Sequence, residues 1–276
     1  MALRLGTLTP SKLYIGATEV TKAFLGTTEV YSSAQPWTPA ALGSALALWL
    51  DAADSSTITL NGSTVSQWND KSGNGRHVSQ ATAASQPTYT PNGLNGKPTL
   101  IFDGVNDHLF RTQSFGLSQP LTIVSMQSFT NSAASLNYML DNQSRLVVGS
   151  RFGISGGNAE LGLYANTWIY AQNPVNSGVA FSISAVANGA SSQLLANGAT
   201  IATGNPGGVG ITTNFVIGNA FDRSSAPWGG RSSEVVILSG NNADHRQRLE
   251  GYLAWKWGTE ANLPANHPFR NSPPTV

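Results

Sequence analysis

Residues 179–198 read Val-Ala-Phe-Ser-Ile-Ser-Ala-Val-Ala-Asn-Gly-Ala-Ser-Ser-Gln-Leu-Leu-Ala-Asn-Gly, and they contain two short apolar runs that each end in an Asn-Gly pair. Asn-Gly favours the positive-φ turns that reverse the chain between antiparallel strands. The same pair recurs at 61–62, 92–93 and 95–96. This stretch predicts a β-hairpin, and the recurrence of its turn signal predicts an all-β protein.

Similar apolar runs lie on both sides of this hairpin. They occupy residues 47–50, 99–102, 121–126, 145–148, 161–164, 215–218 and 234–238. Many short strands joined by tight turns are typical of a β-sandwich or a β-barrel. We therefore expect one large β domain over residues 45–276.

One segment has a helical pattern. Residues 242–258 carry an apolar stripe at i, i+3, i+4 and i+8, made of Leu249, Tyr252, Leu253 and Trp257. Asn242 or Asp244 can cap the start of this helix, and Gly258 can supply the left-handed residue at its end. We expect the stripe to pack on the β domain, with Arg246, Glu250 and Lys256 mostly solvated.

The N-terminus contains a repeat. Gly6, Gly16 and Gly26 recur at a ten-residue spacing inside three similar apolar segments, which predicts a small β-ribbon over residues 1–34. So short a ribbon buries too little apolar surface to be stable alone. We expect it to dock on another protein, with an ordinary hairpin packed on its own domain as the alternative. The expected docking residues are Leu13, Tyr14, Ile15, Phe24, Leu25 and Val30.

The uncharged, proline-containing segment at residues 35–44 is expected to be a linker between this ribbon and the β domain.

The overall composition excludes several classes of partner. Only 11% of the residues are charged, and the formal net charge is +1. This argues against nucleic acid and against an anionic membrane surface, which both select clustered Lys and Arg. No segment approaches the ~20 apolar residues of a membrane span. Cysteine is absent, and the N-terminus lacks the apolar core of a secretory signal. We therefore expect a cytoplasmically made protein whose polar, hydroxyl-rich surface works outside the cell.

Several ordered motifs resemble a known family. Residues 49–52 (Trp-Leu-Asp-Ala), 68–76, 100–109, 215–219, 230–236 and 249–258, followed by Leu-Pro-Ala-Asn-His-Pro at 263–268, look like the concanavalin A-like, laminin-G-type jelly rolls of bacteriophages and bacteria. The N-terminal repeats also look like segments of phage structural proteins. The resemblance covers residues 45 to about 270. It implies a jelly-roll β-sandwich, which hosts lectins, glycosidases and structural modules alike.

The acidic residues give no glycosidase signature. A retaining glycosidase needs two carboxylates about 5–5.5 Å apart, and the six glutamates are isolated in the sequence. Residues 153–157 match the Gly-x-Ser-x-Gly nucleophile motif, but this glycine-rich context lacks the strand-to-helix turn that the motif requires. The four histidines show no metal-ligand spacing. We predict no enzymatic activity and no resident cofactor.

Two binding sites are weighed. Asp70 and Asn74 resemble the start of a calcium loop, and Asp103 and Asp107 are candidate additional ligands. However, Ala81 stands where the loop needs an acid, and Asx-turns are the preferred interpretation. Trp168 and Trp228 lie near expected loops, where they are candidates to stack on a sugar ring, although large aromatic residues are more often structural.

These observations together predict a non-enzymatic virion protein of a tailed phage. In this interpretation residues 1–34 anchor the protein to capsid or tail proteins of the particle, and the jelly roll projects as a capsid decoration or head fibre. The alternatives are a tail-associated adhesin that recognises a host surface glycan, and a glycan-processing enzyme or secreted lectin. The sequence leaves a homo-oligomer open.

Overall fold

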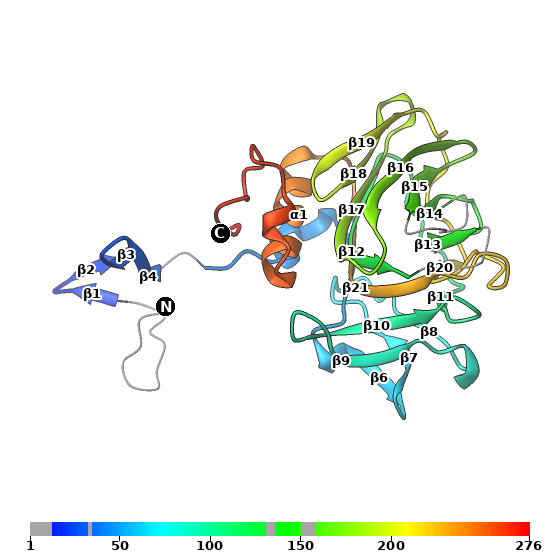
Figure 1. The fold of residues 1–276 in the computed structure, drawn as a ribbon, viewed down its shortest axis with the longest axis horizontal. Coiled ribbons are helices and arrows are strands. Elements are labelled where there is room, and N and C mark those ends of the chain that lie inside the picture. Colours follow the sequence, from blue (N-terminus) through cyan, green and yellow to red (C-terminus); the bar gives the residue numbers. More distant parts are fainter. Residues whose placement is uncertain (1–12, 33–34, 131–135, 151–157) are drawn as a thin grey trace.

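A computed structural model describes residues 13–32, 35–130, 136–150 and 158–276. The first repeat, at residues 3–7, and the Gly-x-Ser-x-Gly motif at 153–157 lie outside these ranges. The described chain is an all-β jelly-roll sandwich with one C-terminal helix and two small N-terminal hairpins (Figure 1). This confirms the predicted fold class.

One sheet contains the longest strand of the protein. Its principal strands, in hydrogen-bonded order, are β19 (Ala199–Gly204), β18 (Ser192–Ala196), β17 (Phe181–Ala187), β12 (Leu121–Phe129), β21 (Gly229–Ser239), β10 (Lys97–Asp103) and β9 (Thr88–Leu94). The C-terminal half of β21 also pairs with β5 (Leu46–Asp51). The β-hairpin predicted within residues 179–198 is confirmed, since β17 and β18 pair there as antiparallel strands.

The opposite sheet is formed by the middle of the chain. In order it contains β8 (Val78–Ser79), β11 (Leu109–Arg111), β20 (Phe215–Ile217), β13 (Asn137–Asp141), β14 (Val147–Ser150), β15 (Asn158–Tyr164) and β16 (Trp168–Asn176). The β6 (Ile58–Asn61) and β7 (Thr64–Trp68) hairpin joins the two sheets through β8 and β9. The main apolar core lies between the sheets, where alternate residues such as Ile123, Phe129, Val235 and Ile237 are buried.

Helix α1 (Ala243–Trp257) packs on the outer face of the first sheet, against β12 and β17. Asn242 caps it by accepting a hydrogen bond from the His245 N–H, and Gly258 ends it in the left-handed conformation. Leu249, Leu253 and Trp257 are buried. The predicted helix and its apolar stripe are therefore confirmed. No described helix is long and apolar enough to cross a membrane.

The segment expected to be a linker is largely part of the domain. Residues 39–45 form a 3₁₀ helix, and Trp37 and Leu42 are buried in the apolar cluster beneath α1. The Trp37 N–H also donates to the Pro274 carbonyl oxygen at 3.1 Å. Burial of Trp37 fixes this part of the expected linker to the helix layer.

The N-terminal ribbon consists of two hairpins, β1 (Leu13–Ile15) with β2 (Thr18–Val20), and β3 (Lys22–Leu25) with β4 (Thr28–Ser32). Gly16 and Gly26 occupy equivalent turn positions with φ of 61° and 63°, which explains why glycine recurs at this spacing. In Figure 1 both hairpins stand away from the sandwich, on the side of α1.

Candidate functional site

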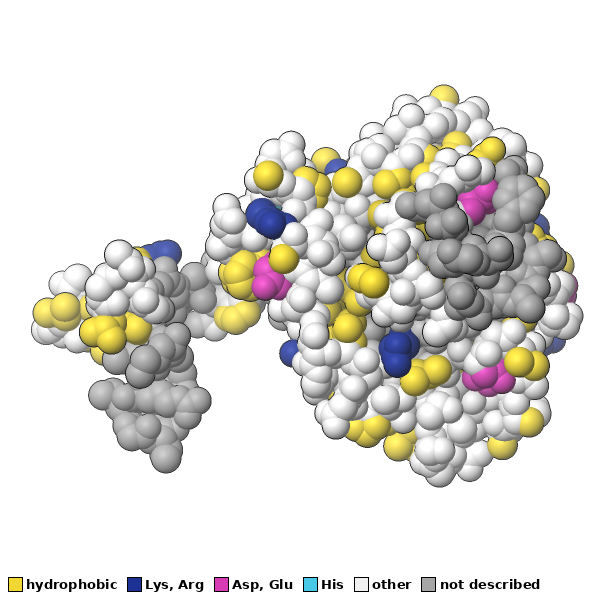
Figure 2. Space-filling model, viewed as in Figure 1, with side chains coloured by type: hydrophobic (Ala, Val, Ile, Leu, Met, Phe, Trp, Pro, Cys, Tyr) yellow, Lys and Arg dark blue, Asp and Glu magenta, His cyan; other side chains and the backbone are white. Residues whose placement is uncertain are grey.

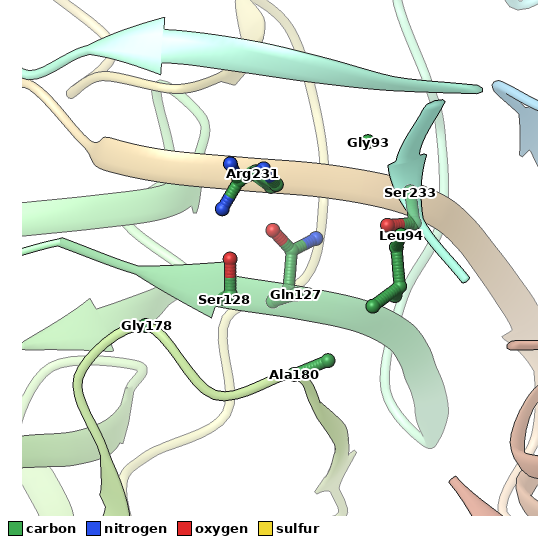
Figure 3. Close-up of a pocket in the computed structure, with 8 residues that line it drawn as sticks. All are labelled: Gly93, Leu94, Gln127, Ser128, Gly178, Ala180, Arg231 and Ser233. Carbon is green, nitrogen blue, oxygen red and sulfur yellow. The ribbon is translucent and has the colours of Figure 1, made fainter. Parts of the chain in front are cut away.

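A polar cavity of about 100 Å³ opens on the outer face of the first sheet. It lies over the neighbouring strands β12 and β21 and is flanked by the end of β9 and by the turn before β17 (Figure 3). Two of its lining residues, Leu94 and Ala180, also pack against the apolar cluster beneath α1. The cavity and the helix therefore occupy the same face of the sheet. The lining residues are Gly93, Leu94, Gln127, Ser128, Gly178, Ala180, Arg231 and Ser233.

A β-bulge places the polar residues of β21 on this face. Met126 pairs with Glu234, but the next residue, Gln127, pairs with Ser232, so that Ser233 is an extra residue in β21. Simple alternation would put Arg231 on the side of Val235, which faces the core. The extra residue reverses this alternation and brings Arg231 to the outer face.

The cavity lining contains buried polar atoms without hydrogen-bond partners among the described residues. They are Gln127 Oε1, Ser128 Oγ, Arg231 Nε and Ser233 Oγ. Gln127, Ser128 and Ser233 are at most 4% exposed. In Figure 3 the Gln127 and Ser128 side chains rise from β12 toward Arg231 on β21. Since buried polar groups are nearly always hydrogen-bonded, such a cluster around one cavity indicates a place for water or a polar ligand.

Of the two tryptophans proposed to bind sugar, the structure excludes Trp228. Its side chain is 1% exposed, and its ring contacts Phe129 in the core at 6.5 Å between centroids. It has no face free for a sugar, because the backbone just before β21 directs its ring into the core between the two sheets. This prediction is wrong.

Trp168 is half-buried on the opposite sheet. Its ring packs at 5.2 Å from the Tyr164 ring and at 6.1 Å from the Tyr138 ring. A Cβ atom at Gly162 would approach the Trp168 ring to 2.6 Å, so this glycine is needed for the ring to lie flat on β15. Trp168 stays a candidate sugar contact, but it is not among the residues that line the polar cavity.

The four candidate calcium ligands form two separate turns. Asp70 accepts hydrogen bonds from the backbone N–H groups of Trp49, Ser72 and Arg76, and the Asn74 amide donates to the Leu46 carbonyl.

In the second turn, Asp103 Oδ1 accepts from the N–H groups of Val105 and Asn106, while Asp107 accepts from the Asp103 N–H. Burial and the Asp103 charge raise the pKa of Asp107 to about 6. Among the described residues, no group of three or more His, Cys, Asp and Glu side chains could hold a metal ion. The geometry is that of Asx-turns, which were the preferred interpretation, and the four candidate calcium ligands lie in two different turns.

Two carboxylates that are distant in the sequence meet beneath α1. Glu234 and Asp51 are paired residues of β21 and β5, and Lys256 Nζ lies 2.7 Å from Glu234 Oε2 and 2.6 Å from Asp51 Oδ1. Burial raises the pKa of Glu234, which the Lys256 charge partly opposes. Two indole N–H groups, of Trp49 and Trp257, also donate to Glu234.

Glu250 is a second buried acid on α1. It accepts from Ser184 Oγ at 2.7 Å, pairs with Arg246 and lies 3.2 Å from His267 Nε2. The expectation that Arg246, Glu250 and Lys256 are mostly solvated is therefore wrong. Glu250 is fully buried, and the two basic side chains are only 13% and 17% exposed. They lie inward because each pairs with a buried carboxylate.

The predicted docking residues divide into two groups. Tyr14, Ile15, Phe24 and Leu25 are 51–76% exposed, whereas Leu13 and Val30 are half-buried. Figure 2 shows apolar side chains on the hairpin surface. The structure thus leaves the apolar residues of both hairpins available for contact.

The cavity residues are not among the sites predicted from the sequence. The run Gly-Gly-Arg-Ser-Ser-Glu at 229–234 is the polar start of an otherwise apolar strand, and this polarity is the feature that could have indicated a binding site. The bulge that gives the run its orientation depends on pairing with β12, which the run itself does not reveal.

Comparisons with known proteins establish the fold. No protein-family model and no curated protein matches the sequence. Domain 4 of the extracellular arabinanase AbnA from Geobacillus stearothermophilus, solved in complex with arabinotriose, is similar over 71% of this chain and 92% of its own, with a TM-score of 0.51 and 13% identity.

Two further solved structures have lower TM-scores. The SAP-like pentraxin of Limulus polyphemus covers 64% of this chain and 86% of its own, with 17% identity and a TM-score of 0.44. Tailspike protein 2 of Escherichia coli O157:H7 bacteriophage CAB120 covers 62% of this chain and 26% of its own, with 15% identity and a TM-score of 0.42. At 13% identity the likeness to the arabinanase domain concerns the fold alone.

Proposed function

We propose that this protein is a non-enzymatic structural protein of a phage particle, whose jelly roll binds a saccharide and whose N-terminal hairpins attach it to the particle. The observation that carries the binding function is the polar cavity between β12 and β21, with its buried, unpartnered side-chain atoms. A saccharide presents many hydroxyl groups that both donate and accept hydrogen bonds, so it can pair with hydroxyl, amide and guanidinium groups together.

The cavity also supplies apolar contact. Leu94 and Ala180 flank the polar strands and can pack against the C–H groups of a sugar ring. The arabinanase domain, solved with arabinotriose, provides an analogy at the level of the fold. Fold analogy alone does not establish a ligand, so the proposal depends on the cavity.

The cavity lacks the groups for glycoside hydrolysis. None of the described residues that line it carries a carboxylate, whereas hydrolysis normally uses a pair of carboxylates that flank the scissile bond. One close pair of acids, Asp51 and Glu234, lies beneath α1 and is held by Lys256. Both acids are under 5% exposed, so a polysaccharide cannot reach them.

Attachment is proposed from the hairpins. Two-stranded hairpins are marginally stable in water, and these expose four large apolar side chains, Tyr14, Ile15, Phe24 and Leu25. A partner surface on the particle would cover these side chains and stabilise both hairpins. Attachment to the capsid would make the protein a capsid decoration, and attachment to the tail would make it an adhesin. The saccharide-binding cavity favours the adhesin alternative.

Binding is tested with purified full-length protein and a panel of host surface polysaccharides, by calorimetry together with an assay for new reducing ends. We expect saturable binding without new ends. Replacing both Ser128 and Ser233 by alanine should weaken binding, whereas Ser79→Ala, at an exposed position of β8, should not. Absence of binding to every member would refute the binding function. New reducing ends that disappear on substitution of one acid would refute the non-enzymatic assignment.

Attachment is tested by starting the chain at Gln35, which retains buried Trp37. We expect this shorter protein to melt cooperatively like the full chain but to be absent from assembled particles. Normal incorporation would show that the hairpins are not the attachment site. Imaging of the intact particle gives the copy number, since decoration requires many copies on the shell and adhesion requires few on the tail.

A further inference from the structure

Arg231 carries the only charge among the described residues that line the cavity. From its position we infer that the site selects an acidic saccharide and that the guanidinium group of Arg231 binds the carboxylate of the sugar. This inference rests on the proposed saccharide-binding function and specifies the class of ligand.

Two other arginines form ion pairs with buried acids, and they show what Arg231 lacks among the described residues. Arg145 pairs with Asp141 at 2.6 Å, and Arg246 pairs with Glu250 at 2.7 Å. No ion pair or hydrogen bond of the Arg231 side chain is present within the described part of the chain, and its Nε atom is buried without a partner. A partly buried guanidinium group that lacks an anion is costly to desolvate, so a ligand carboxylate would be favoured there.

The backbone around Arg231 fixes its direction. Ser233, the extra residue of the bulge, keeps Arg231 on the outer face, where it pairs with Ser128 across the strands. The adjacent Gly230 has a φ of 155°, and a Cβ atom there would lie 2.1 Å from the Ser128 carbonyl oxygen. The close approach of β12 and β21 beside Arg231 thus requires glycine at this position.

The size of the cavity limits what enters it. A volume of about 100 Å³ holds several water molecules. This is enough for a carboxylate and the adjoining part of one sugar ring. The planar guanidinium group can bind both carboxylate oxygens, while Ser128 and Ser233 are placed for the neighbouring ring oxygen or hydroxyl groups. We therefore expect recognition of a single acidic sugar unit, at an end or a branch of the chain.

The test compares acidic and neutral forms of the same saccharides. Oligosaccharides that contain glucuronate, galacturonate or sialic acid, each with its methyl ester, are titrated into the full-length protein by calorimetry. We expect at least one acid to bind at least tenfold more tightly than its ester. We also expect this preference to weaken with added salt, because a charge pair contributes to it.

Arg231→Gln should lower the affinity for the preferred acid roughly ten- to hundredfold, the range for loss of a charge-assisted hydrogen bond, and should abolish discrimination against the ester. Arg231→Lys keeps the charge without the planar fork and should retain part of the discrimination. Arg223→Gln removes an exposed arginine outside the cavity and should change neither value. Thermal melting confirms that each variant is folded.

The outcomes separate the two proposals. Equal binding of acids and esters, or unchanged discrimination in folded Arg231→Gln protein, would overturn the acidic preference while leaving saccharide binding intact. Binding of neutral saccharides only would do the same. Failure of every acidic and neutral saccharide would overturn both.

Discussion

Lys256→Met tests how α1 is held on the sandwich. In the native protein Lys256 Nζ is within 2.7 Å of both the Glu234 and Asp51 carboxylates. Methionine keeps the length and apolar stem of the side chain but removes the cation. Asp51 keeps its 3.0 Å ion pair with Lys71, whereas no other cation among the described residues pairs with the fully buried Glu234.

Removing one partner of a buried ion pair typically costs about 3–5 kcal/mol, because the remaining charge is left uncompensated. This is a large part of the ~5–15 kcal/mol that stabilises a domain. With a shift of about 2–4 °C per kcal/mol for a domain of this size class, the melting temperature should fall by roughly 6–20 °C. Trp49 and Trp257 still donate to Glu234, which favours the lower part of this range.

The assay is thermal and urea unfolding of four proteins: the native chain, Lys256→Met, Glu234→Gln and the double variant. Because glutamine does not need a cation, Lys256→Met should cost at least ~1 kcal/mol less in the Glu234→Gln background. Lys97→Met is the matched control, since no ion pair of Lys97 occurs in the described structure, and it should change stability by less than ~0.5 kcal/mol. A Lys256→Met effect as small as this control, or strict additivity in the double variant, would refute a stabilising role for the buried pair.

Three further substitutions test the packing and the pKa assignments. The pKa of Asp107 is raised to about 6, so the folded chain binds a proton there between about pH 4 and pH 6, and this contribution to stability is lost as the pH rises through that window. Asp107→Asn should therefore be more stable than the native chain above pH 6 and should converge with it near pH 4 in pH-dependent melts; lower stability at pH 7 would contradict this. Trp257→Ala should cost ~3–5 kcal/mol in urea unfolding, and a loss below 1 kcal/mol would mean that the helix is not packed as described. Gly251→Ala should destabilise the protein although alanine favours helices by ~1 kcal/mol, because the new Cβ would lie 2.4 Å from Phe269 Cβ; a rise in melting temperature would contradict this contact.

Local patterns in the sequence predicted the elements well. The 3.6-residue period of Leu249, Leu253 and Trp257 was sufficient to predict α1 and its buried face, and the turn glycines at 16 and 26 were sufficient to predict both hairpins. These features depend on residues within one or two turns of each other. Their physical causes, side-chain periodicity and backbone freedom, are visible in a short window.

The predictions that were wrong concern side chains whose burial depends on residues distant in the sequence. Glu250 looks solvent-exposed by its position on the helix, but it accepts a hydrogen bond from Ser184, 66 residues earlier, inside the interface. Trp228 lies beside a turn in the sequence, yet its ring is buried in the core just before β21 begins. Trp37 is buried in the apolar cluster beneath α1, where its ring lies 6.0 Å from the ring of Tyr252, near the other end of the chain. Burial of these side chains is decided by strand pairing and helix docking, which composition and spacing do not encode.

The bulge at Ser233 is a local feature of β21 whose effect depends on pairing with a distant strand, β12. Along β21 the outer face changes from apolar residues beneath α1, such as Val236, to the polar residues of the cavity, and the change occurs where Ser233 adds one residue to the strand. Without this residue, strict alternation would direct Arg231 toward the core, where an unpaired guanidinium group would be strongly destabilising. The same local irregularity therefore allows β21 to close the sandwich, support the helix and present a cation to the outside. This is why a strand that reads as polar and then apolar can lie at the centre of the sheet.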